Sequence, residues 1–239
     1  MSKLVLYNHE TVSSLNSRHK LMEQEHVTFQ CDGNVGKPPG SYIWQKIRKN
    51  NIELTTYDNV TTVTTAAPQT CTYNGTSVLT IQLTAEDNQA IMRCAEHSMV
   101  SLYKDSEPLN VLYKVRTPKI TKHPNQTYYV VGSGDIELKC HADGNPQSNY
   151  IWLKVDKMNQ NLSSDDSLVI DSTNTTNSGA YECHAFNSLN EKIYYQFQSV
   201  DIFIGRLRHA QSKKESNFYV TSLNSDQITR RKIAFDKNT

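Results

Sequence analysis

The side chains with the most specific chemistry in this chain are its five cysteines, at positions 31, 71, 94, 140 and 183. Cysteines can pair as disulfides, and together with histidines they can hold zinc or support redox catalysis. No two of them form a Cys-x-x-Cys pair, and no cysteine and histidine have the spacing of a zinc tetrahedron. The pattern therefore predicts no metal site.

Other catalytic arrangements are not found in the sequence either. "VGSGD" (131–135) has the glycines of a phosphate-binding loop, but no helix follows to present backbone N–H groups to a phosphate. "GKPPGS" (36–41) lacks the P-loop spacing. No serine, histidine and acid occur in an order that a β fold would assemble, and no cleft with paired carboxylates is indicated. We expect no catalytic residues, no cofactor and no enzymatic activity.

The elements that carry these residues are predicted to be strands. Apolar and polar residues alternate in "VTFQC" (27–31) and "IELKC" (136–140), which is typical of half-buried strands. "SVLTIQL" (77–83) and "SLVI" (167–170) supply a middle strand in each half, and turn-rich stretches such as "GNVGKPPGS" (33–41) separate the elements. No segment has a convincing amphipathic helical period, and no run of eighteen apolar residues could span a bilayer. The sequence predicts an all-β chain.

One arrangement of cysteine and tryptophan occurs twice. The copies are Cys31, Trp44 and Cys94 in the first half, and Cys140, Trp152 and Cys183 in the second. The tryptophan follows the first cysteine by thirteen residues in one copy and by twelve in the other, and both tryptophans lie in the tripeptide "YIW". A repeat of about 110 residues has the size of a domain and not of a solenoid unit.

Cysteine, tryptophan about a dozen residues later, and a second cysteine preceded at two positions by tyrosine resemble the immunoglobulin fold. The resemblance implies two tandem Greek-key β-sandwiches, each with a disulfide between strands B and F of opposite sheets. The implied disulfides are Cys31–Cys94 and Cys140–Cys183, with Trp44 and Trp152 packed against them and Tyr181 as the tyrosine corner of the second domain. In the first domain Met92 stands at the corner position, so that the hydroxyl bond is lost.

The two halves resemble different branches of this family. The first half, with "AEDNQAIMRCAEH" (85–97) and "PLNVLYKV" (108–115), resembles C2-type domains of nectin-like, nephrin-like and CD80-like receptors. The second half, with "NSGAYECHAFNS" (177–188), resembles I-set or C2-set domains of neural-adhesion and hemicentin-like proteins. His141 and His184 each follow a core cysteine, so alternation turns them outward on opposite sheets and no metal pair is expected.

We place the first domain at residues 1–116 and the second at 117–204, joined by a short linker. The remaining segment, 205–239, resembles neither domain. From Arg206 on it has eight Lys or Arg and three Asp or Glu, a charge of +5 against −4 for the rest of the chain. We expect this basic tail to be disordered. The alternatives are a cytoplasmic-type tail whose membrane span lies elsewhere and a patch that binds polyanions.

Three sets of residues are candidates for modification or for contacts with partners. N-glycosylation sequons begin at Asn59, Asn74, Asn125, Asn161 and Asn174. Chance alone would give roughly four. The odd cysteine, Cys71, allows a covalent dimer, an additional bridge within its domain or an unpaired thiol. Alternation from Trp44 and Cys94 turns outward the residues of a predicted partner-binding face, which are Ile43, Ile47, Ile91 and Arg93.

Three functions are consistent with these features. The first is an adhesion or recognition receptor ectodomain that binds a like or unlike protein on another cell. The second is a soluble immune-type factor that binds microbial or glycan surfaces, with Cys71 linking its subunits. The third is a structural spacer within a longer extracellular protein. We expect an extracellular or cell-surface location, a protein partner and no nucleic-acid ligand, since the formal net charge is only +1. The opening "MSKLVLYNH" is too short and too polar for a signal-peptide core, so a leader and an anchor would lie outside these residues.

Overall fold

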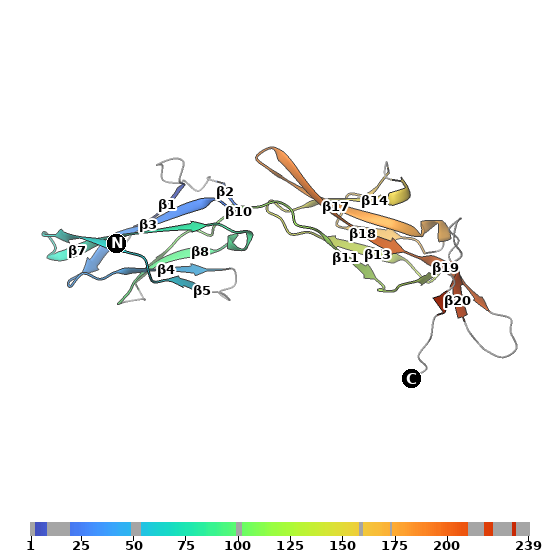
Figure 1. Cartoon of the computed structure of the whole chain (residues 1–239), viewed down its shortest axis with the longest axis horizontal. Coiled ribbons are helices and arrows are strands. Elements are labelled where there is room, and N and C mark those ends of the chain that lie inside the picture. The colour runs from blue at the N-terminus through green and yellow to red at the C-terminus, as the bar shows by residue number, and fades with distance from the viewer. Residues whose placement is uncertain are drawn as a thin grey trace, which may run out of the picture. The chain divides into compact units, whose positions relative to one another are not determined.

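The computed structural model describes residues 3–8, 20–48, 54–98, 102–157, 160–172, 174–209, 218–221 and 231–232. The chain divides into two compact units, Met1–Tyr113 and Lys114–Thr239, close to the predicted boundary at residue 116. Strands make up most of the described part of both units, and its helical elements are short 3₁₀ turns (Figure 1), so the all-β prediction is confirmed. Among the residues described, no helix is long and apolar enough to cross a membrane.

The first unit is built from two four-stranded antiparallel sheets, with the strand orders β1-β3-β7-β6 and β5-β4-β8-β9. The strands of the first sheet are β1 (Lys3–Asn8), β3 (His26–Gly36), β7 (Thr72–Gln82) and β6 (Thr62–Ala67). Those of the second are β5 (Leu54–Tyr57), β4 (Tyr42–Ile47), β8 (Ile91–Glu96) and β9 (Tyr103–Asp105). β2 (Leu21–Met22) pairs in parallel with β10 (Val111–Leu112), and the 3₁₀ turn η2 (Ala85–Asp87) leads into β8.

The core of the first unit lies between its two sheets. β3 alternates as the sequence predicts, with Phe29 and Cys31 fully buried. Trp44 of β4 is also fully buried, with its ring centroid 6.2 Å from that of Phe29, and its Nε1 donates to Ser77 Oγ at 3.1 Å. The disulfide from Cys31 on β3 to Cys94 on β8 therefore joins the two sheets beside a packed indole.

The second unit repeats this two-layer plan. One sheet consists of β11 (Lys119–His123), β13 (Ile136–His141) and β16 (Ser167–Ile170). The other consists of β15 (Asn161–Ser163), β14 (Asn149–Lys154), β17 (Gly179–Leu189) and β18 (Lys192–Ile202). The 3₁₀ turns η3 (Val155–Lys157) and η4 (Thr175–Asn177) precede β15 and β17. The disulfide from Cys140 on β13 to Cys183 on β17 joins the sheets, and Trp152 is fully buried in the same core.

The last strand of the second domain runs past residue 204, the predicted end of the domain. β12 (Tyr129–Val130) pairs in parallel with β19 (Ile204–His209), and Ile202 and Ile204 are buried in the core. Ile202 and Ile204 therefore belong to the sandwich, whereas Phe203 between them is exposed. β20 (Phe218–Thr221) and β21 (Arg231–Lys232) extend this small sheet. The other residues of the predicted disordered tail lie outside the described residues.

Candidate protein-binding interface

A buried tyrosine near the start of β17 holds this strand of the second domain to the turn that precedes it. Tyr181 is buried, and its hydroxyl donates to the main-chain carbonyl of Asn177 at 2.7 Å. Burial, reinforced by the carboxylate of Asp156, raises the pKa of Tyr181 to about 12. This is the geometry of a tyrosine corner. In the first domain the fully buried Met92 takes the same position without a hydroxyl.

The face predicted to bind a partner lies on β4 and β8 of the first domain. The register places Ile43 opposite Ala95 and Ile47 opposite Ile91. Ile43 is only 9% exposed, so the expectation that it faces solvent is wrong. Alternation fixes the face of the sheet on which a side chain lies, but its exposure depends on the side chains beside it on that face. Beside Ile43 on this face lie Ala95 of β8 and, next to Ala95, Tyr103 of β9. Ile47 and Ile91 are half-buried.

Arg93, the fourth residue of that predicted face, is engaged within its own domain. Its Nε and Nη2 donate to the two carboxylate oxygens of Asp105 at 2.7 and 2.9 Å. The hydrogen bonds to Asp105 raise the pKa of Arg93, and its guanidinium lies 3.7 Å from the ring centroid of Tyr103. A bidentate pair of this kind holds the guanidinium in one orientation. On this face the guanidinium of Arg93 is therefore already bound to Asp105 and packed on Tyr103, and it is not a free positive charge surrounded by exposed isoleucines.

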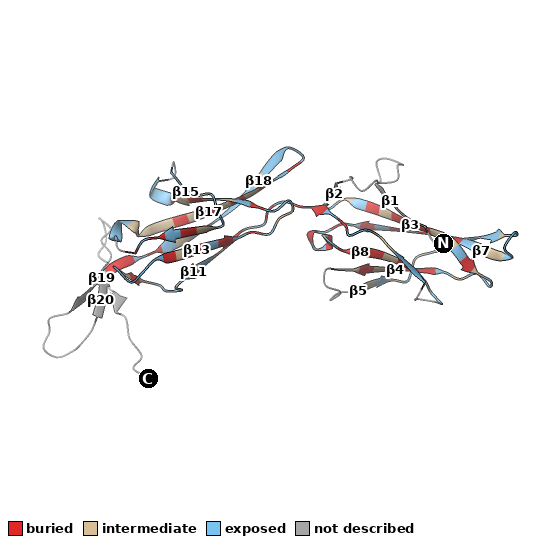
Figure 2. Ribbon diagram, turned by 180° about the vertical axis from the view of Figure 1, so that it is seen from behind, coloured by how far each residue is buried: buried red, intermediate tan, exposed pale blue. Residues whose placement is uncertain are grey.

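The second domain carries a more exposed apolar surface, on β18. Ile193, Tyr195 and Phe197 lie on one side of this strand and are 63%, 70% and 53% exposed. We call these three residues the β18 patch. β18 is an edge strand of the sheet β15-β14-β17-β18, and Figure 2 shows most of it in the colour of exposed residues. Scattered apolar side chains are common on surfaces, but three large ones in a row indicate a contact surface. None of the three was identified from the sequence.

The outward direction of the β18 patch is set by the hairpin between β17 and β18. Two loop residues, Asn190 and Glu191, join the strands, and their φ angles are 47° and 66°. Two positive φ values in a two-residue loop are typical of a type I′ turn, which fixes the register of the strands. This register places His184 opposite Phe197. Because Cys183 points into the core, the next residue and its partner point outward.

His184 and Phe197 extend the patch onto β17. Their rings stack with centroids 5.2 Å apart and an interplanar angle of 15°, and His184 Nε2 lies 2.9 Å from Glu182 Oε2. The half-buried Ile151 of β14 lies opposite His184 in the same sheet. His141 is exposed on β13, in the other sheet. No group of three His, Cys, Asp or Glu side chains that could hold a metal ion occurs in the described part of the chain.

All five sequon asparagines are exposed. In the second domain Asn125 follows β11, Asn161 begins β15, and Asn174 caps η4 by accepting a hydrogen bond from the Thr176 amide at 2.9 Å. None of these three asparagines lies on β17 or β18, and β15 is at the opposite edge of the sheet from β18. A glycan at Asn161 would therefore begin at the edge of the sheet farthest from the β18 patch.

Cys71 lies in the turn between β6 and β7. It is exposed, is not disulfide-bonded within the described residues, and has a φ angle of 52°. The turn leaves its sulfur accessible. A covalent dimer through Cys71 stays a prediction.

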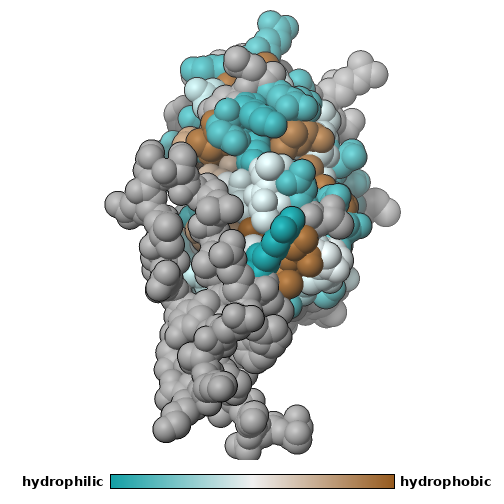
Figure 3. Space-filling model, turned by 90° about the vertical axis from the view of Figure 1, so that its right-hand side faces the viewer, coloured by the Kyte–Doolittle hydropathy of each residue, from teal (hydrophilic) through white to brown (hydrophobic). Residues whose placement is uncertain are grey.

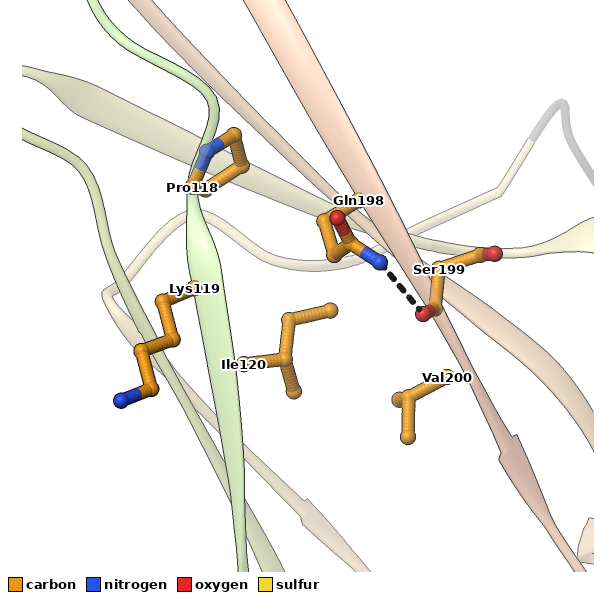
Figure 4. Close-up of a pocket in the computed structure, with 6 residues that line it drawn as sticks. All are labelled: Pro118, Lys119, Ile120, Gln198, Ser199 and Val200. Carbon is orange, nitrogen blue, oxygen red and sulfur yellow. Dashed lines mark hydrogen bonds between the residues drawn. The ribbon is translucent and has the colours of Figure 1, made fainter.

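A shallow depression of about 310 Å³ lies between β11 and β18 of the second domain. Its walls are Pro118, Lys119 and Ile120 on one side and Gln198, Ser199 and Val200 on the other (Figure 4). The Gln198 Nε2 group donates to the main-chain carbonyl of Ser199 at 3.4 Å, and Lys119 is exposed. The depression is a gap between edge strands without the convergent polar groups of a small-molecule site.

On the face shown in Figure 3, apolar side chains form small patches separated by polar ones.

Two family models match the chain in succession. Residues 11–100 match the CD80-like C2-set immunoglobulin domain, and residues 117–187 match the immunoglobulin domain. The chain belongs to the immunoglobulin superfamily. Its two compact units are therefore tandem immunoglobulin domains, and the resemblance drawn from the cysteines and tryptophans is confirmed.

One relative of the chain is named for cell adhesion. Human cell adhesion molecule 1 is 31% identical over 175 residues, which cover 70% of this chain and 36% of that protein. Protein sidekick of Drosophila melanogaster is 35% identical over 75 residues, 31% of this chain and 3% of that protein. This chain thus spans well under half the length of either relative.

Among solved structures, the full ectodomain (Ig1–Ig3) of mouse nectin-like molecule 4 superposes with a TM-score of 0.53 at 15% identity, over 84% of this chain and 64% of that one. At this level of identity the likeness shows the immunoglobulin fold alone.

Proposed function

We propose that this chain is part of an extracellular or cell-surface protein that acts in cell adhesion or cell-surface recognition, by binding another protein through the outer sheet faces of its immunoglobulin domains. The β18 patch carries this proposal, because it is an exposed apolar surface on the sheet of a disulfide-linked domain. Exposed apolar surfaces of this kind bind proteins, whereas small molecules are bound in concave pockets. The similarity to human cell adhesion molecule 1 supports the same role.

The covalent framework supports an extracellular location. The disulfides Cys31–Cys94 and Cys140–Cys183 lie inside two separate cores. Disulfides of this structural kind persist in secreted and surface proteins and are rare in the cytosol. The exposure of all five sequon asparagines is compatible with glycosylation in the secretory pathway.

A soluble recognition factor is the second candidate, and the exposed Cys71 favours it. A disulfide between two copies would make a bivalent molecule, and bivalency raises the apparent affinity for a repetitive microbial or glycan surface without any new contact. Covalent dimers on non-reducing gels that disappear in Cys71→Ser would support this candidate. A structural spacer, the third function considered, would bind no protein at all.

A bead assay tests the adhesion proposal. The full chain is produced as a secreted protein with its disulfides intact and is attached to fluorescent beads. We expect these beads to cluster with one another, to adhere to cells or to bind members of a panel of purified extracellular proteins. Beads that carry the reduced and alkylated chain are the control, since loss of the disulfides should unfold both sandwiches. Failure of the oxidised chain in all three assays would overturn the adhesion proposal and leave the soluble factor and the spacer role.

A further inference from the structure

We infer, building on the proposed function, that β18 is a self-association edge. Two copies of this chain pair their β18 strands antiparallel about a two-fold axis at Tyr195, which joins two sheets into one continuous sheet. The partner of the β18 patch is thus a second copy of the same chain. This surface is separate from the predicted face on β4 and β8 of the first domain.

The edge of β18 is open for pairing. In the part of the chain that the structure describes, β17 is the one strand that pairs with β18, and its register is continuous. Proteins usually protect an exposed edge strand with charges, proline or a bulge. The stretch Ile193–Val200 contains no charged residue, no proline and no glycine. It therefore offers an unprotected row of main-chain donors and acceptors to another strand.

The stretch nearest the hairpin is the part that can pair. β11 lies beside Gln198–Val200, where Pro118–Ile120 form the other wall of the depression in Figure 4. Toward Lys192 the hairpin of β17 and β18 extends past β14 (Figure 1). A pair centred on Tyr195 uses Lys192–Gln198 and so overlaps β11 only at its end.

The pairing register follows first from the faces of the strand. Around a two-fold axis perpendicular to the sheet, outward side chains of one copy must lie opposite outward side chains of the other. An axis at Tyr195 meets this condition, since it places Ile193 opposite Phe197 of the second copy and Tyr195 opposite itself. The three residues of each β18 patch then form one apolar row of six side chains. Aromatic and aliphatic cross-strand pairs of this kind stabilise a sheet.

Charge and apolar pairing together favour this register over its two neighbours. With the axis at Tyr195, Lys192 lies opposite Gln198, and no like charges meet. An axis shifted to Tyr194 keeps the faces matched but places Phe197 opposite the charged Glu191, so one residue of each patch loses its apolar partner. An axis shifted the other way, to Gln196, also keeps the faces matched, but it places Glu191 opposite Asp201. Like charges directly opposite each other destabilise a strand pair.

The exposed area indicates a weak dimer. Aromatic side chains bury roughly 150–250 Å² each, so Tyr195 and Phe197, at 70% and 53% exposure, offer together roughly 250 Å² per copy. Ile193 and the strand backbone add to this, but stable complexes bury about 800 Å² per partner. We therefore expect a reversible dimer that gains strength when many copies are displayed on facing surfaces.

Sedimentation velocity of the full chain measures the self-association, with Cys71→Ser as the parent so that no bond through Cys71 contributes. We expect a dimer whose fraction rises with concentration. Tyr195→Lys places two positive charges opposite each other at the axis and should weaken the dimer by about tenfold or more. Val169→Lys is the matched control, because Val169 is 60% exposed on β16 in the other sheet. Both positions are exposed, so both variants should fold, which thermal unfolding verifies.

A disulfide cross-link tests the register directly. Directly opposite residues of an antiparallel pair have Cα atoms about 4.5–5.5 Å apart, which is within the range of a disulfide. In the Cys71→Ser parent, oxidation should give a covalent dimer of Tyr195→Cys and none of Val169→Cys.

Any one of three results would overturn self-association at β18. The chain could stay monomeric up to about 1 mM. Tyr195→Lys could leave the dimer as strong as before, or Tyr195→Cys could fail to cross-link. If the chain is monomeric but Tyr195→Lys abolishes bead binding to an unlike protein, the β18 patch binds that protein, self-association is excluded, and the adhesion function stands. If the unsubstituted chain neither self-associates nor binds cells or other proteins, both the self-association at β18 and the adhesion function are overturned.

Discussion

The ammonium group of Lys46 lies 2.9 Å from the carboxylate of Asp87, and both side chains are buried. Arg48 Nε lies 3.3 Å from the same carboxylate. The second domain has the matching lysine, Lys154, also two residues after its core tryptophan. Asn177, the last residue of η4, takes the place that Asp87 has at the end of η2. Lys154 instead donates a hydrogen bond to the main-chain carbonyl of Thr176 at 2.7 Å. Lys154 also lies 3.5 Å from the carboxylate of Asp156, but that side chain is exposed. The first domain therefore holds its lysine with a buried carboxylate, and the second with a main-chain carbonyl and an exposed carboxylate.

Asp87→Asn should strongly destabilise the first domain. The substitution keeps the size of the side chain but leaves Lys46 buried without its carboxylate, and breaking a buried ion pair from one side costs about 3–5 kcal/mol. Urea unfolding in a Trp152→Phe background, followed by the fluorescence of Trp44, measures the change in the first domain. Asp58→Asn is the control, because Asp58 is exposed in the same domain. Equal effects of the two substitutions would show that the ion pair contributes no stability.

The same carboxylate should make the first domain sensitive to acid. Burial raises the pKa of Asp87, but hydrogen bonds from Lys46 and the Thr84 amide, with the charges of Lys46 and Arg48, hold the pKa below its ordinary value. A carboxyl with a lowered pKa in the folded state contributes stability above the unfolded value, about pH 4, and this stability is lost as the pH falls through the folded value.

The free energy of unfolding of the first domain should therefore fall below about pH 4. Asp87→Asn should remove that part of the pH dependence, which urea titrations at a series of pH values would measure. An identical pH profile for the substituted and unsubstituted chains would contradict the prediction.

The strands and the disulfide framework could be predicted because their signals are local or repeated. Alternation in 27–31 and 136–140 identifies one strand in each domain whichever fold contains it. The spacing of cysteine and tryptophan then selects the immunoglobulin fold. Lys46 shares its face with Trp44, so alternation also indicates a buried lysine. Its partner Asp87 lies far along the chain, and that pairing could not be read from either segment alone.

The exposed face of β18 could not be predicted from the strand alone. Ile193, Tyr195 and Phe197 alternate with residues that are also compatible with a strand, so both phases of the pattern are acceptable. The phase comes from the two-residue loop, and Asn190-Glu191 is not the Asn-Gly or Asp-Gly pair that marks such a loop in a sequence. The error at Ile43 has a related cause, since alternation does not report the neighbours that cover a face.

Tyr181→Phe should destabilise the second domain by about 0.5–1.5 kcal/mol, the net contribution of one hydrogen bond. The phenyl ring keeps the packing, but the Asn177 carbonyl loses the donor that lies 2.7 Å away. Tyr195→Phe is the matched control at low protein concentration, because Tyr195 is 70% exposed. A Tyr181→Phe chain as stable as the control would show that the corner hydrogen bond does not contribute.

The hydroxyl of Tyr181 should also give the second domain a distinct response to base. Burial raises its pKa to about 12, whereas a tyrosine in an unfolded chain ionises near pH 10. A raised pKa in the folded state contributes stability below the unfolded value, and this is lost as the pH rises toward the folded value. The unsubstituted domain should therefore lose stability between about pH 10 and 12, and Tyr181→Phe should lose less. Thermal unfolding at alkaline pH measures both, and parallel losses would exclude Tyr181 as the cause.

Each disulfide should stabilise its own domain independently of the other. Cys140 and Cys183 are 43 residues apart and Cys31 and Cys94 are 63 apart. Closing loops of these lengths stabilises by about 4 kcal/mol in the chain-entropy model. Because each domain contains one of the two tryptophans, Trp44→Phe and Trp152→Phe backgrounds report the two unfolding transitions separately.

Replacing both cysteines of one pair by alanine should therefore lower the stability of that domain and leave the other transition in place. Cys71→Ser, which removes the one cysteine outside these pairs, should leave both transitions unchanged. Mass mapping of the oxidised chain should recover the two pairings seen in the structure. A different connectivity, or a loss of stability in both domains when one pair is removed, would contradict two independently stapled sandwiches.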